Sequence, residues 1–187
     1  MKSLARNEKA LSTVVTTLII LVVSVLLAGI VTMYAINITS TRTQQEDLRL
    51  TKQAIWAYSD GTAFAALTVD NVGGRDVVID KVQVRGVESE WGLVHFVRRS
   101  TALSASLICP SASINWSESF TYATGNSATL SNDTDDKPLA SGNTIVLYVE
   151  APDSINVNDI GTTIGITIFT ENAQYYVECN VKSAENV

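Results

Sequence analysis

The sequence predicts an α+β protein, in which a long N-terminal hydrophobic α-helix precedes an all-β, immunoglobulin-like sandwich domain. Two observations support this fold class. Residues 11–36 carry no charge, and a run of that length can cross about 30 Å of hydrocarbon as a helix. From Leu48 onward, short runs with β-type alternation are separated by turn residues, a spacing typical of a sandwich.

The apolar run is predicted to be helical although it is rich in Val, Ile and Thr, which favour strands in water. Inside lipid, a single segment can satisfy its own backbone N–H and C=O groups only as a helix. The run is also longer than a secretory signal core, which is usually about 7–15 apolar residues. We therefore expect a membrane-inserted stem helix over residues 11–47, with the polar residues 37–47 continuing the helix.

Charges flanking the run predict its orientation and its partners. Lys2, Arg6 and Lys9 precede the run and favour a cytoplasmic N-terminus, so residues 48–187 are expected to form an extracellular β-domain. The whole chain has a net charge of −6 and its first ten residues are net basic. The exported part is therefore acidic and would repel the phosphates of nucleic acid, which is not expected as a partner.

The β-domain is expected to contain nine short strands and one long polar loop. Gly165 inside a strand predicts a bulge or close packing. The aromatic residues favour core packing, with a carbohydrate-binding platform as the alternative. The segment 111–119 is too polar to assign, and residues 124–143 are predicted to be a long polar loop or a small excursion at the surface. The expected strands are 48–58, 62–70, 76–86, 93–97, 102–109, 118–123, 144–151, 162–170 and 173–181.

The two cysteines and three sequons suggest covalent features of an exported domain. Cys109 and Cys179 are an even number, which predicts one disulfide in an oxidising compartment; the alternative is two separate buried thiols. Asn37, Asn115 and Asn132 each begin an Asn-X-Ser/Thr triplet and are expected glycosylation sites.

Residues that could support chemistry are few, so we expect no enzyme, no metal and no cofactor. His95 is the only histidine, and a lone histidine in an apolar run more often packs than catalyses. No second histidine is present to complete a zinc site, and phosphate-binding and nucleophile motifs are absent from the sequence. Residues 132–136 offer oxygens for calcium but lack EF-hand spacing, which favours a solvated acidic loop.

The junction between leader and helix carries a family resemblance. A short basic leader, the small residue Ala10 and then Leu11-Ser12 opening the apolar run resemble the class III signal of type IV pilin-like proteins, in its archaeal form. This resemblance implies that a membrane-embedded prepilin peptidase cuts between Ala10 and Leu11 and removes residues 1–10. The turn Asn71-Val72-Gly73-Gly74 also resembles a turn of archaeal pilin β-domains.

One departure from the family pattern separates this sequence from the bacterial type IV pilins. Bacterial type IV pilins usually have glutamate at the fifth residue after the cut, where this sequence has Val15. Archaeal pilins and archaellins commonly lack that acid, so the resemblance is to the archaeal group. The stem also lacks the helix-breaking proline of the bacterial family.

The resemblance implies a pilin, a structural subunit of an extracellular archaeal type IV pilus-like filament that serves adhesion. Its partners would be copies of itself, joined through their N-terminal helices, together with the prepilin peptidase and the pilus assembly machinery. It would reside in the cell membrane as a precursor and then in the surface filament. Three alternatives stay open: an archaellin of a motility filament, a minor pilin-like component of a secretion or uptake machine, and a single-pass membrane-anchored surface binding protein.

Overall fold

The computed structural model describes the backbone of residues 4–186 and the side chains of residues 11–41 and 44–185. Lys2 of the predicted leader lies outside the described residues, as do the side chains of Arg6 and Lys9. The chain divides into a helical unit that ends at Thr43 and a β-domain that begins at Gln44. The predicted succession of a long apolar helix and a large β-sandwich is confirmed.

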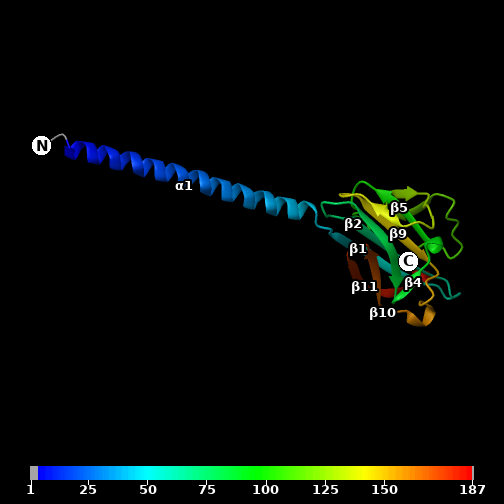
Figure 1. The fold of residues 1–187 in the computed structure, drawn as a ribbon. Coiled ribbons are helices and arrows are strands. Elements are labelled where there is room, and N and C mark those ends of the chain that lie inside the picture. Colours follow the sequence, from blue (N-terminus) through cyan, green and yellow to red (C-terminus); the bar gives the residue numbers. More distant parts are fainter. Residues whose placement is uncertain (1–3, 187) are drawn as a thin grey trace. The chain divides into compact units, whose positions relative to one another are not determined.

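The helical unit is the single helix α1, Leu4–Thr43 (Figure 1). It contains no proline, and its only glycine is Gly29, so nothing in the sequence interrupts the backbone hydrogen bonds. The helix ends at Thr43 rather than at residue 47, because residues 44–47 bond to the β-domain instead. The prediction of a helix is therefore confirmed, but the predicted helix extends four residues too far at its C-terminal end.

The β-domain consists of two sheets that share one strand. The strand order is β4-β3-β10-β11-β1-β2-β9-β5, with β8 added beside β3; a hairpin of β6 and β7 lies apart. Strand β11 pairs antiparallel with β10 and, near its end, parallel with β1 (Figure 1). The strands are β1 (Leu48–Ala57), β2 (Ala63–Asn71), β3 (Val77–Val84), β4 (Val87–Ser89), β5 (Val94–Arg99), β6 (Phe120–Ala123), β7 (Asn126–Ala128), β8 (Lys137–Leu139), β9 (Thr144–Glu150), β10 (Thr163–Thr170) and β11 (Gln174–Ser183).

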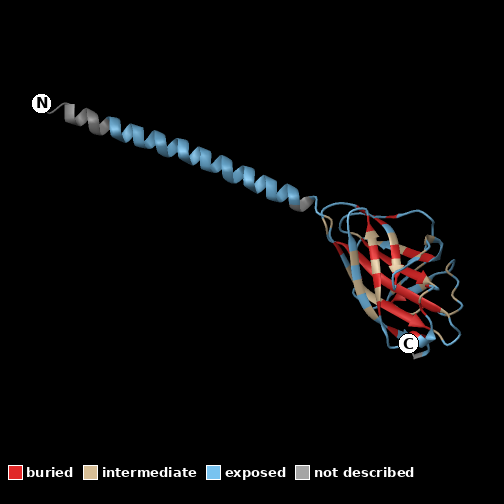
Figure 2. Ribbon diagram, turned by 60° about the horizontal axis from the view of Figure 1, so that its bottom comes forward, coloured by how far each residue is buried: buried red, intermediate tan, exposed pale blue. Residues whose placement is uncertain are grey.

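Two hydrophobic clusters lie on opposite faces of the β1–β2–β9–β5 sheet. Because side chains alternate along a strand, Ile55 and Leu67 face the first cluster, between the two sheets, while Trp56 and Ala66 face the second. The second cluster is covered by the chain between β5 and β8, which contributes Trp116 and Tyr122. Figure 2 shows the resulting buried strands inside an exposed shell.

Strand β3 changes its alternation to keep four apolar residues inside. Val77, Ile79, Val82 and Val84 are all buried, although their spacing places them in two phases. The register against β10 shifts between the pairs Thr170–Ile79 and Phe169–Lys81, so one extra residue is accommodated as a bulge. This explains the mixed phase that the sequence shows over 76–86.

Two expectations about the chain between β5 and β9 are wrong, and a third segment there carried no prediction. Residues 102–109 do not form a strand: they run irregularly across the second cluster, with only a single bridge from Leu107 to Ala123. The expected loop over 124–143 contains β7 and β8. The unassigned segment 111–119 places Trp116 against the second cluster. Such segments are hard to predict because they lie irregularly over the second cluster and do not pair as strands, so their apolar residues have no regular spacing.

Candidate functional site

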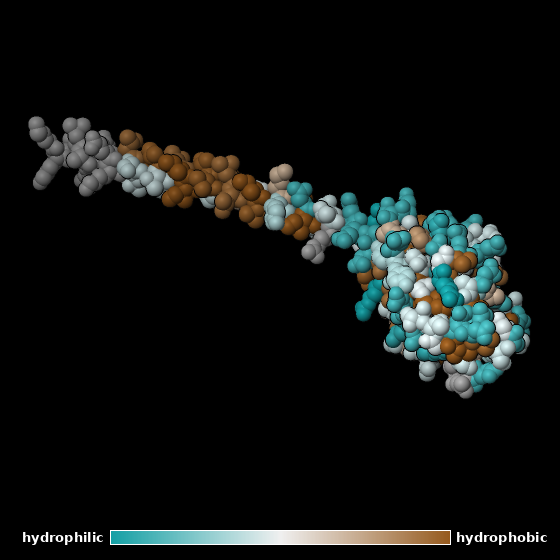
Figure 3. Space-filling view, turned by 90° about the horizontal axis from the view of Figure 1, so that it is seen from below, coloured by the Kyte–Doolittle hydropathy of each residue, from teal (hydrophilic) through white to brown (hydrophobic). Residues whose placement is uncertain are grey.

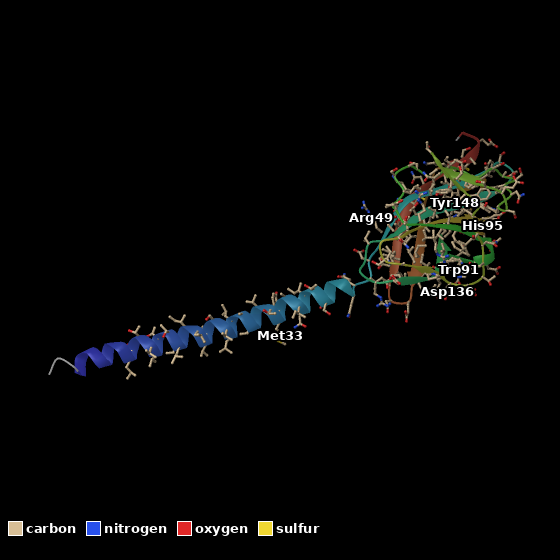
Figure 4. All side chains as sticks on the ribbon, turned by 90° about the horizontal axis from the view of Figure 1, so that it is seen from above. Met33, Arg49, Trp91, His95, Asp136 and Tyr148 are labelled. Atoms are coloured by element: carbon tan, nitrogen blue, oxygen red, sulfur yellow. The ribbon has the colours of Figure 1, made fainter. Side chains whose placement is uncertain are left out.

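The surface of α1 is apolar in every direction. The six consecutive residues from Leu18 to Val23 are each between 53 and 62% exposed. Successive residues point about 100° apart around a helix, so these six residues cover the full circumference. Figure 3 shows apolar colouring along most of the described helix, with paler and more hydrophilic patches toward its two ends, and Met33 projects outward from the helix in Figure 4.

This surface needs an apolar environment. The span Leu11–Thr41 is long and apolar enough to cross a membrane, so the N-terminal helix fits membrane association. Each large aliphatic side chain contributes about 1.5–3 kcal/mol when it is transferred out of water. More than a dozen such side chains are exposed on α1, so leaving them in water would cost on the order of tens of kcal/mol.

Hydroxyl groups on α1 bond to their own helix. Thr16 donates to the carbonyl of Ser12 at 2.9 Å, Ser24 to that of Ile20 at 2.7 Å, and Thr32 to that of Ala28 at 2.8 Å. This back-bonding satisfies the hydroxyl without an external partner. The helix therefore presents an apolar surface even at its Ser and Thr positions.

The predicted cleavage junction lies within α1. Ala10 and Leu11 are both in helical backbone, and Leu11 is 68% exposed. The side chains of the leader residues lie outside the described part of the chain. Cleavage between these two residues stays a prediction.

The segment that follows α1 is held by a glycine turn of the β-domain. The backbone N–H groups of Val72 and Gly73 both donate to the carbonyl of Asp47 at 3.0 Å, and that of Gly74 donates to Gln45 at 3.3 Å. A Cβ on Gly73 would lie 2.6 Å from the backbone nitrogen of Asp47, so this close approach requires glycine. We call these contacts the exit clamp.

The β10–β11 turn completes the exit clamp from the other side. The carboxylate of Glu46 accepts hydrogen bonds from the Thr170 hydroxyl at 2.5 Å and the Asn172 amide at 3.4 Å. Within the glycine turn, the Asn71 amide donates to Arg75 and Leu139 carbonyls. The sequence contains only the double glycine as a signal, because the hydrogen-bond partners are distant in sequence: the glycine turn lies 25 to 29 residues from the segment it holds, and the β10–β11 turn 124 to 126 residues away.

His95 occupies a packed aromatic site in the β-domain. Its ring stacks on Trp116 with centroids 4.1 Å apart, and the Glu150 carboxylate lies 3.1 Å from His95 Nε2 and accepts from Trp116 Nε1 at 2.8 Å. Burial lowers the pKa of His95, while the Glu150 carboxylate opposes that shift. Figure 4 shows His95 and Tyr148 inside the β-domain. The arrangement attaches the cover of the second cluster to the sheet.

Lys137 occupies the acidic loop that the sequence offers for calcium. Its side chain is fully buried, and its ammonium group donates to the backbone carbonyls of Asp133 and Asp135 and to the Asp133 carboxylate. The ammonium also lies 4.4 Å from the centre of the Trp91 ring. The loop thus already binds a cation from its own chain. Among the described residues, no group of three or more His, Cys, Asp or Glu is arranged to hold a metal ion.

The predicted disulfide between Cys109 and Cys179 is wrong in this structure: both thiols are free. Cys109 packs against the second cluster and Cys179 against the first, so the β1–β2–β9–β5 sheet separates them. Burial raises the pKa of Cys179 to about 11 and also raises that of Cys109, so both thiols are protonated at neutral pH. The alternative of two separate thiols is the one observed.

The three sequon asparagines are exposed. Asn37 lies on α1, within the span that is apolar enough for a membrane. Asn115 donates to the Glu118 carboxylate at 3.0 Å and Asn132 to the Gly92 carbonyl at 2.8 Å, both in irregular segments of the β-domain. Glycosylation of these residues stays a prediction.

Comparisons with known proteins add little to these observations. No protein-family model matches the sequence, and no curated protein matches it. Among solved structures, a copper-bound PCuAC domain from PmoF2 is similar at a TM-score of 0.34 and 12% identity, over 75% of this chain and 99% of that chain. A likeness at that level carries no conclusion about the function of this chain.

Proposed function

We propose that this chain is a pilin, the structural subunit of an extracellular archaeal type IV pilus-like filament. The observation that carries the proposal is the circumferentially apolar surface of α1. A helix with no polar face must be buried on every side. Lipid supplies that burial before assembly, and the helices of neighbouring subunits supply it in the filament core.

Exchange between these two environments makes assembly feasible. Apolar burial contributes roughly 25 cal/mol per Å² relative to water in either setting, so leaving lipid for a helical core loses little. The basic leader opposes this step, because each charge moved to the bilayer centre costs about 2.5–3.5 kcal/mol on a translocation scale. Removal of residues 1–10 by the prepilin peptidase takes away Lys2, Arg6 and Lys9.

The β-domain would form the outer surface of the filament and serve adhesion. The exit clamp makes residues 45–47 part of the folded domain, so the domain begins directly after the helix in sequence. We also propose that the β-domain has an immunoglobulin-like fold. It is supported by the largely antiparallel pairing around one inter-sheet core.

The N-terminus of surface material tests the proposal. Filaments sheared from the native host should contain a mature peptide that begins Leu11-Ser12-Thr13, as read by mass spectrometry. The variant Ala10→Glu should block both processing and filament formation, whereas the matched variant Ala10→Gly should allow both. Assembled filaments of full-length chains would contradict the proposal. A chain that keeps its leader and never assembles would instead favour a membrane-anchored surface binding protein.

A further inference from the structure

The outer face of the β3–β10–β11 sheet carries an exposed aromatic ring in a fixed position. Tyr176 is 62% exposed, whereas the described Trp residues pack against the two clusters. Tyr176 on β11 lies opposite Thr167 on β10, and Thr167 lies opposite Gln83 on β3. We call this face the aromatic platform; it comprises Gln83, Gly165, Thr167, Phe169, Tyr176 and Glu178.

A glycine makes room for the Tyr176 ring to lie against the sheet. A Cβ on Gly165 would be 2.3 to 2.6 Å from two ring carbons and the hydroxyl oxygen of Tyr176, so any other residue would displace the ring. The Tyr176 hydroxyl donates to the Glu178 carboxylate at 2.8 Å, which fixes the far end of the side chain. The hydroxyl end of the Tyr176 side chain is therefore held beside Gly165 before any ligand arrives, while much of the side chain stays exposed to solvent.

Groups that form hydrogen bonds border this ring. Thr167 and Gln83 are half-buried on the same face, and they supply a hydroxyl and an amide, which both donate and accept. Phe169 lies two residues beyond Thr167, the partner of Tyr176, on β10, roughly 7 Å away along the strand. Lys81 lies over the Phe169 ring at 5.7 Å. The platform thus offers two aromatic positions with polar groups between them.

We propose that the aromatic platform binds a neutral polysaccharide built of pyranose rings. The face of an aromatic ring is electron-rich and attracts the polarised C–H groups on the flat side of a pyranose, while the sugar hydroxyls bond to the amide and hydroxyl groups nearby. Two aromatic positions on neighbouring strands, roughly 7 Å apart along the strand direction, suit successive sugars of an extended chain. The chain's net charge of −6 disfavours an acidic polysaccharide.

This inference rests on the exported position of the β-domain proposed above and adds a ligand class to it. Full-length protein in detergent would be co-sedimented with insoluble cellulose, chitin and cross-linked dextran, with alginate beads as the acidic comparison. We expect binding to at least one neutral polymer and weaker binding to alginate. Tyr176→Ala should lower that binding about tenfold, the loss of one aromatic contact.

Gly165→Ala gives the sharper test, because it keeps the tyrosine and moves its ring. The displaced atoms are the far end of an exposed side chain, so the β-domain should stay folded, as circular dichroism would check. Binding should fall as far as in Tyr176→Ala, whereas Ile160→Ala, an exposed apolar residue elsewhere, should leave it unchanged.

Two results would overturn the proposal. One is that no neutral polymer binds, or that one binds equally to all three variants. The other is that Tyr176→Ala changes self-association by analytical ultracentrifugation without changing polymer binding, which would make the platform a contact between copies of this chain. Either result leaves the N-terminal test of filament assembly unaffected, so the two proposals fail separately.

Discussion

The helix α1 and the β-domain of this chain treat apolar side chains in opposite ways. Leu21 on α1 is 59% exposed, whereas Leu67 at the centre of β2 is fully buried. The β-domain buries its apolar residues within itself, on one face of β10 and on both faces of β2, while α1 is apolar on all sides and buries none of these residues. The difference teaches that one part of the chain is complete alone and the other requires an apolar partner.

Removing the helix should produce the largest effect. Residues 44–187 contain both hydrophobic clusters, so we expect this fragment to be a folded monomer without detergent, whereas the full chain requires detergent. Size-exclusion chromatography and circular dichroism check both properties. An aggregated or unfolded fragment would show that the β-domain depends on the helix after all.

Truncating one leucine in each region should sharpen the contrast. Leu67→Ala removes a fully buried side chain from the first cluster and should lower the free energy of unfolding of the β-domain by about 2–5 kcal/mol. Leu21→Ala on α1 should leave that free energy unchanged. Urea unfolding followed by near-ultraviolet circular dichroism measures both, and equal effects would break the comparison.

Lys137→Ala should destabilise the β-domain by about 3 kcal/mol. The substitution empties the space beneath the acidic loop and leaves the carbonyls of Asp133 and Asp135 without their donor, and breaking a buried charged contact is costly. Lys182→Ala, at an exposed position, is the matched control. A loss below about 0.5 kcal/mol, typical of surface changes, would show that the loop does not need the ammonium.

Gly73→Ala should weaken the exit clamp by about 1–3 kcal/mol, in the range of overpacking. The new Cβ would meet backbone atoms of Gln45 and Asp47, which cannot move aside as a flexible side chain can. Hydrogen exchange at the amides of residues 72–74 should increase, while exchange in β9 stays unchanged. Gly92→Ala provides the control, since a Cβ there meets nothing within 4 Å.

Acidification gives the smallest expected effect. Burial lowers the pKa of His95 in the folded protein below its usual 6.5, so the unfolded chain takes up a proton first. The stability due to a neutral His95 is therefore complete above pH 6.5 and is lost as the pH falls through the folded pKa. The slope of unfolding free energy against pH between 7 and 5 should be smaller in His95→Gln, and an unchanged slope would exclude this residue as its source.

The sequence predicts α1 and the main strands correctly, because the structure of these elements depends on residues that are close together in the chain. The uncharged run gave α1, and alternating residues bounded by turns gave the main strands, because both signals depend on neighbours in sequence. The cover of the second cluster was missed since its apolar residues, such as Leu107 and Trp116, have no period. The disulfide was mispredicted because cysteine count carries no information about which side of a sheet each thiol faces.

The features of the candidate site also differ in how far the sequence predicts them. The apolar surface of α1 follows from composition alone, whereas the exit clamp and the aromatic platform depend on contacts between distant strands. Gly165 was flagged as a bulge or a close contact, and the structure shows the close contact, with Tyr176. Nothing in the sequence alone connected that glycine to that tyrosine.

The position of β11 has a consequence for the order of folding. The strand that joins the two sheets is the last one in the chain, and it contacts the first: Gln53 bonds to Glu178, 125 residues away, and Ile55 pairs with Val181. Contacts of such sequence separation form slowly, because a long loop must close before they stabilise anything. The β-domain therefore cannot complete its fold until nearly the whole chain has been synthesised. If the β-domain is exported as proposed above, this delay would keep the domain from folding before it has crossed the membrane.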